Sequence, residues 1–273
     1  MQEIKIEDKL YPNELRKIKS PPNKIYIKGN LELLKNVSIA IVGSRECTSY
    51  GFRQAYEFSK ELSKNNICII SGLAEGIDTA AHLGAMHQIG KTIAVIGSGF
   101  NYIYPEENKI LLESIIKNDG LVITEYSLNE EPKPTNFPKR NRIMSGLSKG
   151  ILIVEAKNRS GTLITAKFAN EQNKKVFCIP NNIDSKNSIG TNNLINQGAK
   201  LVINVNDILQ EIIEEETNEE YKCIYSILNS YPMNINEIAK KANLSIAETN
   251  QIITMLEIEG LIEKLPNNEF IKR

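Results

Sequence analysis

The chain has 273 residues, which is long enough to bury a full-sized core in one or two domains. Its 33 basic and 33 acidic side chains cancel, so the total charge does not indicate a nucleic-acid binder. No apolar run approaches the roughly 20 residues that cross a bilayer, and the N-terminus lacks the apolar stretch of a secretory signal. We therefore expect a cytoplasmic protein without membrane insertion.

The cysteines and histidines form no recognisable metal or disulfide framework. Four cysteines lie far apart without a Cys-x-x-Cys pair, and only His82 and His87 accompany them. Cys68 and Cys178 sit inside apolar runs, where a cysteine usually acts as a small buried hydrophobe. We expect no metal and no cofactor.

From residue 37 onward, short apolar runs alternate with longer amphipathic segments. Runs such as 37–43, 66–71 and 91–97 are typical of strands that are covered on both faces. Alternation with helices of ten or more residues predicts an α/β protein with a doubly wound, mostly parallel sheet. We assign this domain to 36–213, with 1–35 as an N-terminal extension that packs on its core.

A second, smaller unit is expected at the C-terminus, over 219–273. The acidic stretch 210–221 indicates a helix end and linker, and the following helices and a turn at 266–268 indicate a winged helix. Ser245 and Glu248 have the spacing of a capping box at the start of the recognition helix.

That recognition helix is poorly suited to duplex DNA. It carries Glu248, Glu257 and Glu259 but no Lys or Arg, and the unit holds eight acidic against six basic residues. A helix that reads duplex DNA usually offers basic or amide side chains. A protein-contact or regulatory role and weak duplex binding both stay open, the first being favoured.

Small residues mark four expected strand ends, at 43–45, 71–78, 97–101 and 158–162. Glycines there let the backbone approach a ligand, and the helix N-termini that follow point amide N–H groups at anions. None of these loops matches the dinucleotide or ATP phosphate-loop patterns. Together they predict a phosphate-binding rim without nicotinamide chemistry or ATP hydrolysis.

The segment 134–143 adds an aromatic side chain and cations at the start of a predicted helix. Phe137 can stack on a base, and the neighbouring cations can neutralise phosphates. Asn141 adds an amide donor. This combination predicts binding to single-stranded nucleic acid.

Residues 11–205 closely resemble the bacterial DNA-processing protein A family, called DprA or Smf. The ordered matches include AIVGSR, SGLAEGIDTAAH, VIGSGFNYIYPEEN, FPKRNRIMSGLS and SGTLITAKFA. The resemblance implies an extended Rossmann-like domain with a small C-terminal winged-helix domain. It also implies a homodimer without catalytic activity that binds and protects incoming single-stranded DNA and loads a RecA-type recombinase in natural transformation and recombination.

The resemblance also implies a DNA-binding surface. Arg45 is the expected phosphate contact, and the glycines of two loops allow close approach of the strand: Gly72, Gly97 and Gly99. The stacking and electrostatic wall is expected from the FPKRNR segment: Phe137, Lys139, Arg140, Asn141 and Arg142. The groove is completed by the SGTLITAK segment: Ser160, Gly161, Thr162 and Lys167. Asp78 and Glu125 match family positions too, but we expect them to cap and pack.

Two other functions compete with this one. One is that of the related phosphoribohydrolases, which carry a catalytic Glu in a Pro-Gly-Gly-x-Gly-Thr-x-x-Glu loop. Residues 160–165 of this chain instead read SGTLIT, with no Glu in the following turn. Alternatively, the first domain senses a nucleotide-like ligand and the winged helix is its output module.

Overall fold

The apolar runs of the sequence form the strands of one large sheet. In the computed structural model, the order is β1-β2-β6-β5-β4-β3-β7-β8-β9, and the strands from β6 to β9 are all parallel. The first two strands continue the sheet in antiparallel fashion. The strand bounds are β1 Gln2–Lys5, β2 Lys24–Gly29, β3 Ser38–Val42, β4 Cys68–Ser71, β5 Thr92–Val95, β6 Leu121–Thr124, β7 Gly150–Ile153, β8 Lys175–Cys178 and β9 Lys200–Leu201.

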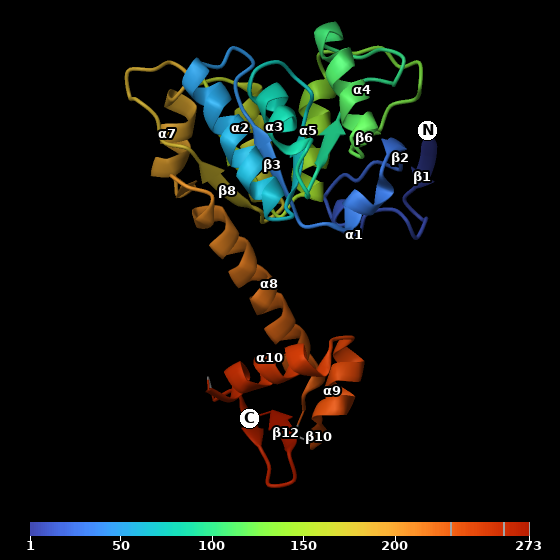
Figure 1. Ribbon diagram of the computed structural model, residues 1–273, viewed down its shortest axis with the longest axis vertical. Coiled ribbons are helices and arrows are strands. Elements are labelled where there is room, and N and C mark those ends of the chain that lie inside the picture. The colour runs from blue at the N-terminus through green and yellow to red at the C-terminus, as the bar shows by residue number, and fades with distance from the viewer. Residues whose placement is uncertain (230, 259, 273) are drawn as a thin grey trace. The chain divides into compact units, whose positions relative to one another are not determined.

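Helices cover both faces of this sheet, as expected for a doubly wound fold. Figure 1 shows α2 and α3 in front of the strands, where the two helices pack together. On the other face, Leu15 of α1, Ile143 of α5 and Ala166 of α6 join one buried apolar cluster. The bounds are α1 Asn13–Arg16, α2 Ser49–Lys64, α3 Ile77–Ala85, α4 Lys109–Lys117, α5 Asn136–Leu147, α6 Gly161–Glu171 and α7 Ile189–Asn196, with 3₁₀ turns at Leu31–Lys35 and Glu106–Asn108.

The central strand β3 fixes where a ligand can enter. Along the chain, β3 connects through α2 to β4 on one side, while its other neighbour is β7. The strand order therefore reverses between β3 and β7. Crevices at such switch points, beyond the carboxyl ends of the strands, are where open α/β sheets bind ligands.

The structure describes residues 1–229, 231–258 and 260–272, apart from the side chains of 213–220, so Glu259 lies outside the described residues. Contacts divide the chain into two compact units, Met1–Ile208 and Leu209–Arg273. Helix α8, Asn206–Ile227, runs without a break through the stretch in which we expected a linker. Among the described helices, none is long and apolar enough to cross a bilayer.

The second unit is a winged helix, as predicted. Its elements are β10 Met233–Asn234, α9 Ile235–Ala242, α10 Ile246–Ile258, β11 Ile262–Lys264 and β12 Glu269–Lys272. The expected capping box is present: the Glu248 amide donates to Ser245 Oγ at 3.2 Å, and the Ser245 amide donates to Glu248 Oε2 at 2.8 Å. Strand β10 was not predicted; it extends the wing by pairing with β12.

Candidate nucleic-acid interface

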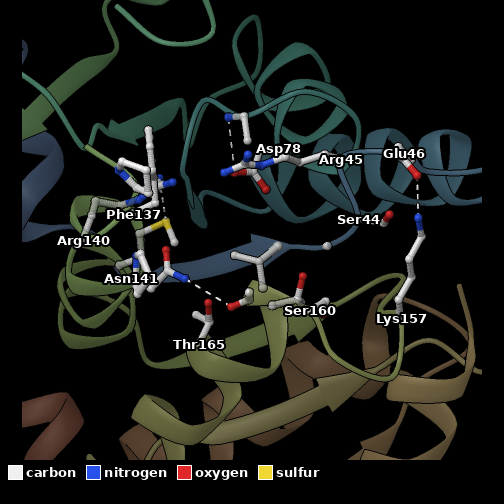
Figure 2. A pocket seen from close by; sticks show the side chains of 18 of the residues that line it. Ser44, Arg45, Glu46, Asp78, Phe137, Arg140, Asn141, Lys157, Ser160 and Thr165 are labelled. Atoms are coloured by element: carbon white, nitrogen blue, oxygen red, sulfur yellow. Dashed lines mark hydrogen bonds and ion pairs between the residues drawn. The ribbon is translucent and has the colours of Figure 1, made fainter. Parts of the chain in front are cut away.

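A pocket of about 540 Å³ opens at the switch point of the sheet (Figure 2). It lies beyond the carboxyl ends of β3 and β7, between one face of α5 and the first turn of α6. Residues of α5 at positions 137, 140, 141 and 144 line it, and these share one helical face by their spacing. Its remaining wall comes from Pro138 of α5 and from four other segments: Val42–Glu46, Ala74 with Asp78, Tyr104 with Pro134, and Lys157 with Ser160–Thr162 and Thr165.

Aromatic rings and an exposed arginine form one side of this pocket. The Arg45 guanidinium lies over the Phe137 ring, with Cζ 5.5 Å from the ring centroid. The Tyr104 ring lies 5.4 Å from the Phe137 ring, centroid to centroid, at a tilt of 47°. Arg45 is exposed and lies in no ion pair among the described residues, so its charge is available at the pocket mouth. A planar cation beside aromatic rings suits both a base and a phosphate.

Arg140 forms the floor of the pocket and is only 4% exposed. Its Nη1 donates to the Val95 carbonyl at 2.6 Å and lies 3.4 Å from the Met144 sulfur. Gly72 makes this placement possible, because a Cβ there would lie 1.8 Å from Nη1. Burial lowers the pKa of Arg140 to about 10, against the opposite effect of the nearby Asp78 carboxylate.

Asp78, in the first turn of α3, is the counter-charge of Arg140. Its Oδ2 accepts hydrogen bonds from the Gly72 amide at 3.1 Å and the Ala74 amide at 3.4 Å. Burial raises the pKa of this carboxyl, while the Arg140 charge and these amides act to lower it. Asp78 therefore holds the loop after β4 against the floor, which is the capping and packing role expected from the sequence.

The opposite side of the pocket is the N-terminal end of α6. Ser160 is its N-cap residue, with extended backbone angles, yet its side chain makes no capping hydrogen bond. Asn141 of α5 reaches across and donates through Nδ2 to the Gly161 carbonyl at 3.4 Å. Thr162 and Thr165 are buried on the pocket side of the same helix. The free first-turn amides of a helix favour an anion at this end.

A buried carboxylate fixes the outer rim. Glu155, which follows β7, is fully buried and accepts from the Thr48 amide at 2.9 Å and from the Thr48 hydroxyl. It also accepts from Asn181 and Asn187, each through Nδ2 at 3.4 Å. Because Thr48 is the N-cap of α2, this network ties the loop that carries Arg45 to the end of β7.

Several residues expected to bind DNA do not line this pocket. Lys139 and Arg142 border a separate cavity of about 460 Å³ on another side of α5. There Arg142 donates to both carboxylate oxygens of Glu125, at 2.9 and 2.7 Å, so Glu125 has the packing role expected for it. The Lys167 side chain is 76% exposed, and its Nζ lies 3.8 Å from a Glu171 oxygen.

Two expected glycines support the pocket from behind. A Cβ at Gly97 would lie 3.0 Å from the Phe137 ring, so the glycine leaves room for that ring. Gly99 lies farther away, against the Ser127 carbonyl, where a Cβ would come within 2.1 Å. Gly97 therefore shapes the wall of the pocket without lining it, whereas Gly99 allows the close packing of its own loop.

The lining residues that sequence reasoning missed include Tyr104, Lys157 and Thr165. Thr165 had a signal, because it follows Gly161 by one helical turn and so shares its face. Tyr104 and Lys157 had none, since only the tertiary fold brings their loops to the pocket.

Fold and pocket together define an extended Rossmann-like α/β protein with a C-terminal winged-helix domain. Residues 2–213 match the family model for DNA recombination-mediator protein A, and residues 213–268 match that for the DprA winged helix domain. The chain belongs to the DNA recombination-mediator protein A family. The expected family and fold class are thereby confirmed.

Curated relatives show the same similarity. The DNA processing protein DprA of Streptococcus pneumoniae is 47% identical over 206 residues, covering 76% of this chain and 72% of that protein. The protein Smf of Synechocystis is 41% identical, covering 98% of this chain and 79% of that protein.

Solved structures agree. The crystal structure of DprA from Streptococcus pneumoniae matches with a TM-score of 0.74 at 44% identity, covering 77% of this chain and 74% of that one. DNA processing protein A from Helicobacter pylori, whose structure concerns its single-stranded DNA binding mode, matches with a TM-score of 0.70 at 30% identity, covering 79% of this chain and 97% of that one.

Proposed function

We propose that this protein binds single-stranded DNA in the switch-point pocket and acts as a non-catalytic mediator of recombination in the cytoplasm. The observation that carries the proposal is the Arg45 guanidinium 5.5 Å from the Phe137 ring centroid at the pocket mouth. An unpaired base can stack there while the cation meets its phosphate. The family of the chain and the Helicobacter pylori relative support the same substrate.

The expected residues take different parts in this proposal. Those that line the pocket contact the strand directly: Arg45, Phe137, Asn141, Ser160, Gly161 and Thr162. Arg140 acts from below through its charge, Gly72 leaves space for its guanidinium, and Gly97 leaves space for the Phe137 ring. The cations outside the pocket continue the electrostatic path for the phosphates along the helices: Lys139, Arg142 and Lys167.

The charged groups of the pocket favour binding over catalysis. A general acid or base must reach its substrate within hydrogen-bond distance. Asp78 lines the pocket, but its Oδ2 already accepts hydrogen bonds from the amides of Gly72 and Ala74. The carboxylate of Glu46, at the rim, is paired with Lys157. We therefore propose that the strand leaves the pocket chemically unchanged.

Two partners belong to this proposal: a second copy of the chain and a RecA-type recombinase. Strand β9 is the last strand at one edge of the sheet, and large exposed apolar side chains lie beside it, with Leu201 45% and Ile203 71% exposed. Exposed sheet edges of this kind pair readily with another strand. A dimer would place two pockets on one strand, which the protein protects and passes to the recombinase in natural transformation.

The test is a fluorescence-anisotropy titration of a labelled oligonucleotide, single-stranded or duplex, across a salt series. We expect tighter binding of the single strand, with an affinity that falls as salt rises because each neutralised phosphate releases counterions. Arg45→Ala should weaken binding about tenfold, the size of one lost charge-assisted contact. The matched control is Arg53→Ala, an exposed arginine on α2.

Either of two results would overturn the proposal. One is no measurable binding to the single strand at low salt. The other is equal affinity in the Arg45→Ala and Arg53→Ala variants, which would place the strand elsewhere.

A further inference from the structure

The switch-point pocket holds an unusual concentration of buried polar atoms without hydrogen-bond partners. Among the described residues, five buried side-chain nitrogen or oxygen atoms have none, and three of their residues line this pocket: Arg140 through Nε, Ser160 through Oγ and Thr165 through Oγ1. Folded proteins satisfy nearly all such groups, because an unsatisfied buried donor destabilises the fold. A ligand that accepts hydrogen bonds would explain why these donors are kept.

Two of the three donors lie at the start of one helix. Ser160 precedes α6 and Thr165 lies in its second turn, one turn after Gly161. Thr165 is fully buried, and Figure 2 draws Ser160 and Thr165 below the pocket, with Arg45 and Asp78 above it. A Cβ added at Gly161 would meet no atom within 4 Å, so the space in front of the helix is open.

The chemistry of this corner fits a phosphate group. The 11-residue helix α6 directs its first amides and the positive end of its dipole at the open space. Two hydroxyls flank those amides and have no acceptor of their own. Arg140 and Arg45 add positive charge from the floor and the mouth of the same pocket. The group that binds here meets donors from at least two directions.

We propose that this corner is a subsite for a terminal phosphate, the monoester of a strand end or of a free mononucleotide. A monoester carries a charge near −2 and three acceptor oxygens. An internal phosphodiester carries one charge and two free oxygens, so it leaves part of the donor set unused. The inference rests on the proposed function and adds that the pocket recognises the end of the strand.

The same pocket has room for the attached nucleoside. Its volume of about 540 Å³ lies within the range of roughly 300 to 1,000 Å³ that encloses small ligands. The rings of Phe137 and Tyr104 line the pocket as well, on the side away from α6. A terminal nucleotide with its phosphate at α6 would direct its base towards these rings.

The experiment compares three oligothymidylates of equal length, labelled at an internal base: one with a 5′-phosphate, one with a 3′-phosphate and one with hydroxyls at both ends. We expect one phosphorylated strand to bind about tenfold more tightly than the unphosphorylated strand, the scale of a few charge-assisted hydrogen bonds. Thymidine monophosphate should compete with the strand better than thymidine does. This competition tests the free nucleotide as the source of the phosphate, whereas the comparison of the three strands tests the strand end.

Two variants locate the subsite. Ser160→Ala and Thr165→Val should each reduce the preference for the phosphorylated strand to less than about threefold, because each removes a donor. Thr165→Val should melt at the same temperature as the wild type or higher, since a methyl replaces a hydroxyl that has no partner. The control is Asn170→Ala, an exposed position of α6 outside the pocket lining.

The outcomes separate this inference from the proposed function. Equal binding of all three strands would overturn the terminal-phosphate subsite and leave single-strand binding intact, as would a preference that survives both variants. If no strand binds, the proposed function fails, and calorimetry with thymidine monophosphate then tests the subsite directly: heat that is lost in Thr165→Val supports it, and no heat overturns it.

Discussion

The two units of the molecule treat buried polar groups in opposite ways. In the first unit, four charged or imidazole side chains are less than 10% exposed: Asp78 and Arg140, which line the pocket, Glu155, which holds its rim, and His82 of α3. In the described part of the second unit, the core consists of apolar side chains, and the one buried polar side chain, Thr249, donates to the Ser245 carbonyl at 2.8 Å.

This difference indicates that the first unit loses some folding stability in order to hold the charges of the switch-point pocket. Taking a charge out of water costs several kcal/mol unless partners compensate it, whereas apolar packing stabilises without such a cost. The first unit keeps a set of buried charges that hold the loop of Arg45, the loop after β4 and the floor of the pocket. The winged helix is a simply packed module whose function must lie on its surface.

The largest expected effect is on the floor of the pocket. Arg140→Met should lower the free energy of unfolding by about 3–5 kcal/mol, because it leaves Asp78 buried without its counter-charge. Urea denaturation of the first unit measures this loss of unfolding free energy. The matched control is Arg53→Met, on the exposed surface of α2, which should change stability by no more than about 0.5 kcal/mol. Equal stability in the two variants would contradict the assignment of Arg140 as a buried structural charge.

The next effect depends on pH. Burial lowers the pKa of His82 from 6.5 to about 3, so the folded protein keeps this ring neutral while the unfolded chain protonates it. The unfolded state then binds more protons below pH 6.5, and stability falls as pH falls from there towards 3. His82 alone contributes about 1.4 kcal/mol per pH unit in that range.

Replacing the ring isolates that contribution. His82→Gln removes the titrating group while its amide can still meet the Thr92 hydroxyl, which lies 2.8 Å from Nδ1. Thermal denaturation at a series of pH values should show a shallower loss of stability in the variant than in the wild type. Parallel pH profiles would show that His82 is already protonated in the folded protein.

A smaller effect is expected in the winged helix. Thr249→Val removes one buried hydrogen bond from an apolar surrounding and should cost about 1 kcal/mol. Hydrogen exchange followed by mass spectrometry measures this loss of stability, which should appear as faster amide exchange confined to α9 and α10. A loss as large as that of Arg140→Met would remove the contrast between the units.

The smallest effect concerns the surface of the recognition helix. Glu248 and Glu257 are exposed on α10, and the helix carries no basic residue. If the helix contacts protein, as we expect, Glu257→Lys should leave the affinity for duplex DNA within about twofold. A gain of several fold, together with a steeper salt dependence, would indicate a helix that faces the DNA groove.

The sequence predicted the layers of the fold well, because buried parallel strands and amphipathic helices have different periods. It also identified much of the pocket, since strand-to-helix loops with glycines gather at one edge of such a sheet. It could not tell Arg140 from Arg142. The two lie on different faces of α5, and only the packing of that helix decides which arginine is buried under the pocket and which pairs with Glu125.

The edges of the sheet were harder to predict. Residues 1–35 contribute β1 and β2 to the sheet: β2 pairs antiparallel with β6, a contact distant in sequence that no local pattern indicates, and β1 pairs with β2. Strand β9 has two residues, too few for a periodic signal. Thr165 could have been found, since helical spacing from Gly161 places it on the pocket side.

The close approach of Gly72 to the Arg140 guanidinium couples two positions that lie far apart in the sequence. A Cβ at 72 would lie 1.8 Å from Nη1, so any side chain there requires the Arg140 guanidinium to shift from its place against the Val95 carbonyl. In a mutational library, Gly72→Ala should be purged beside Arg140 and recovered beside a smaller residue. The geometry of one contact thus couples the effects of substitutions at these two positions.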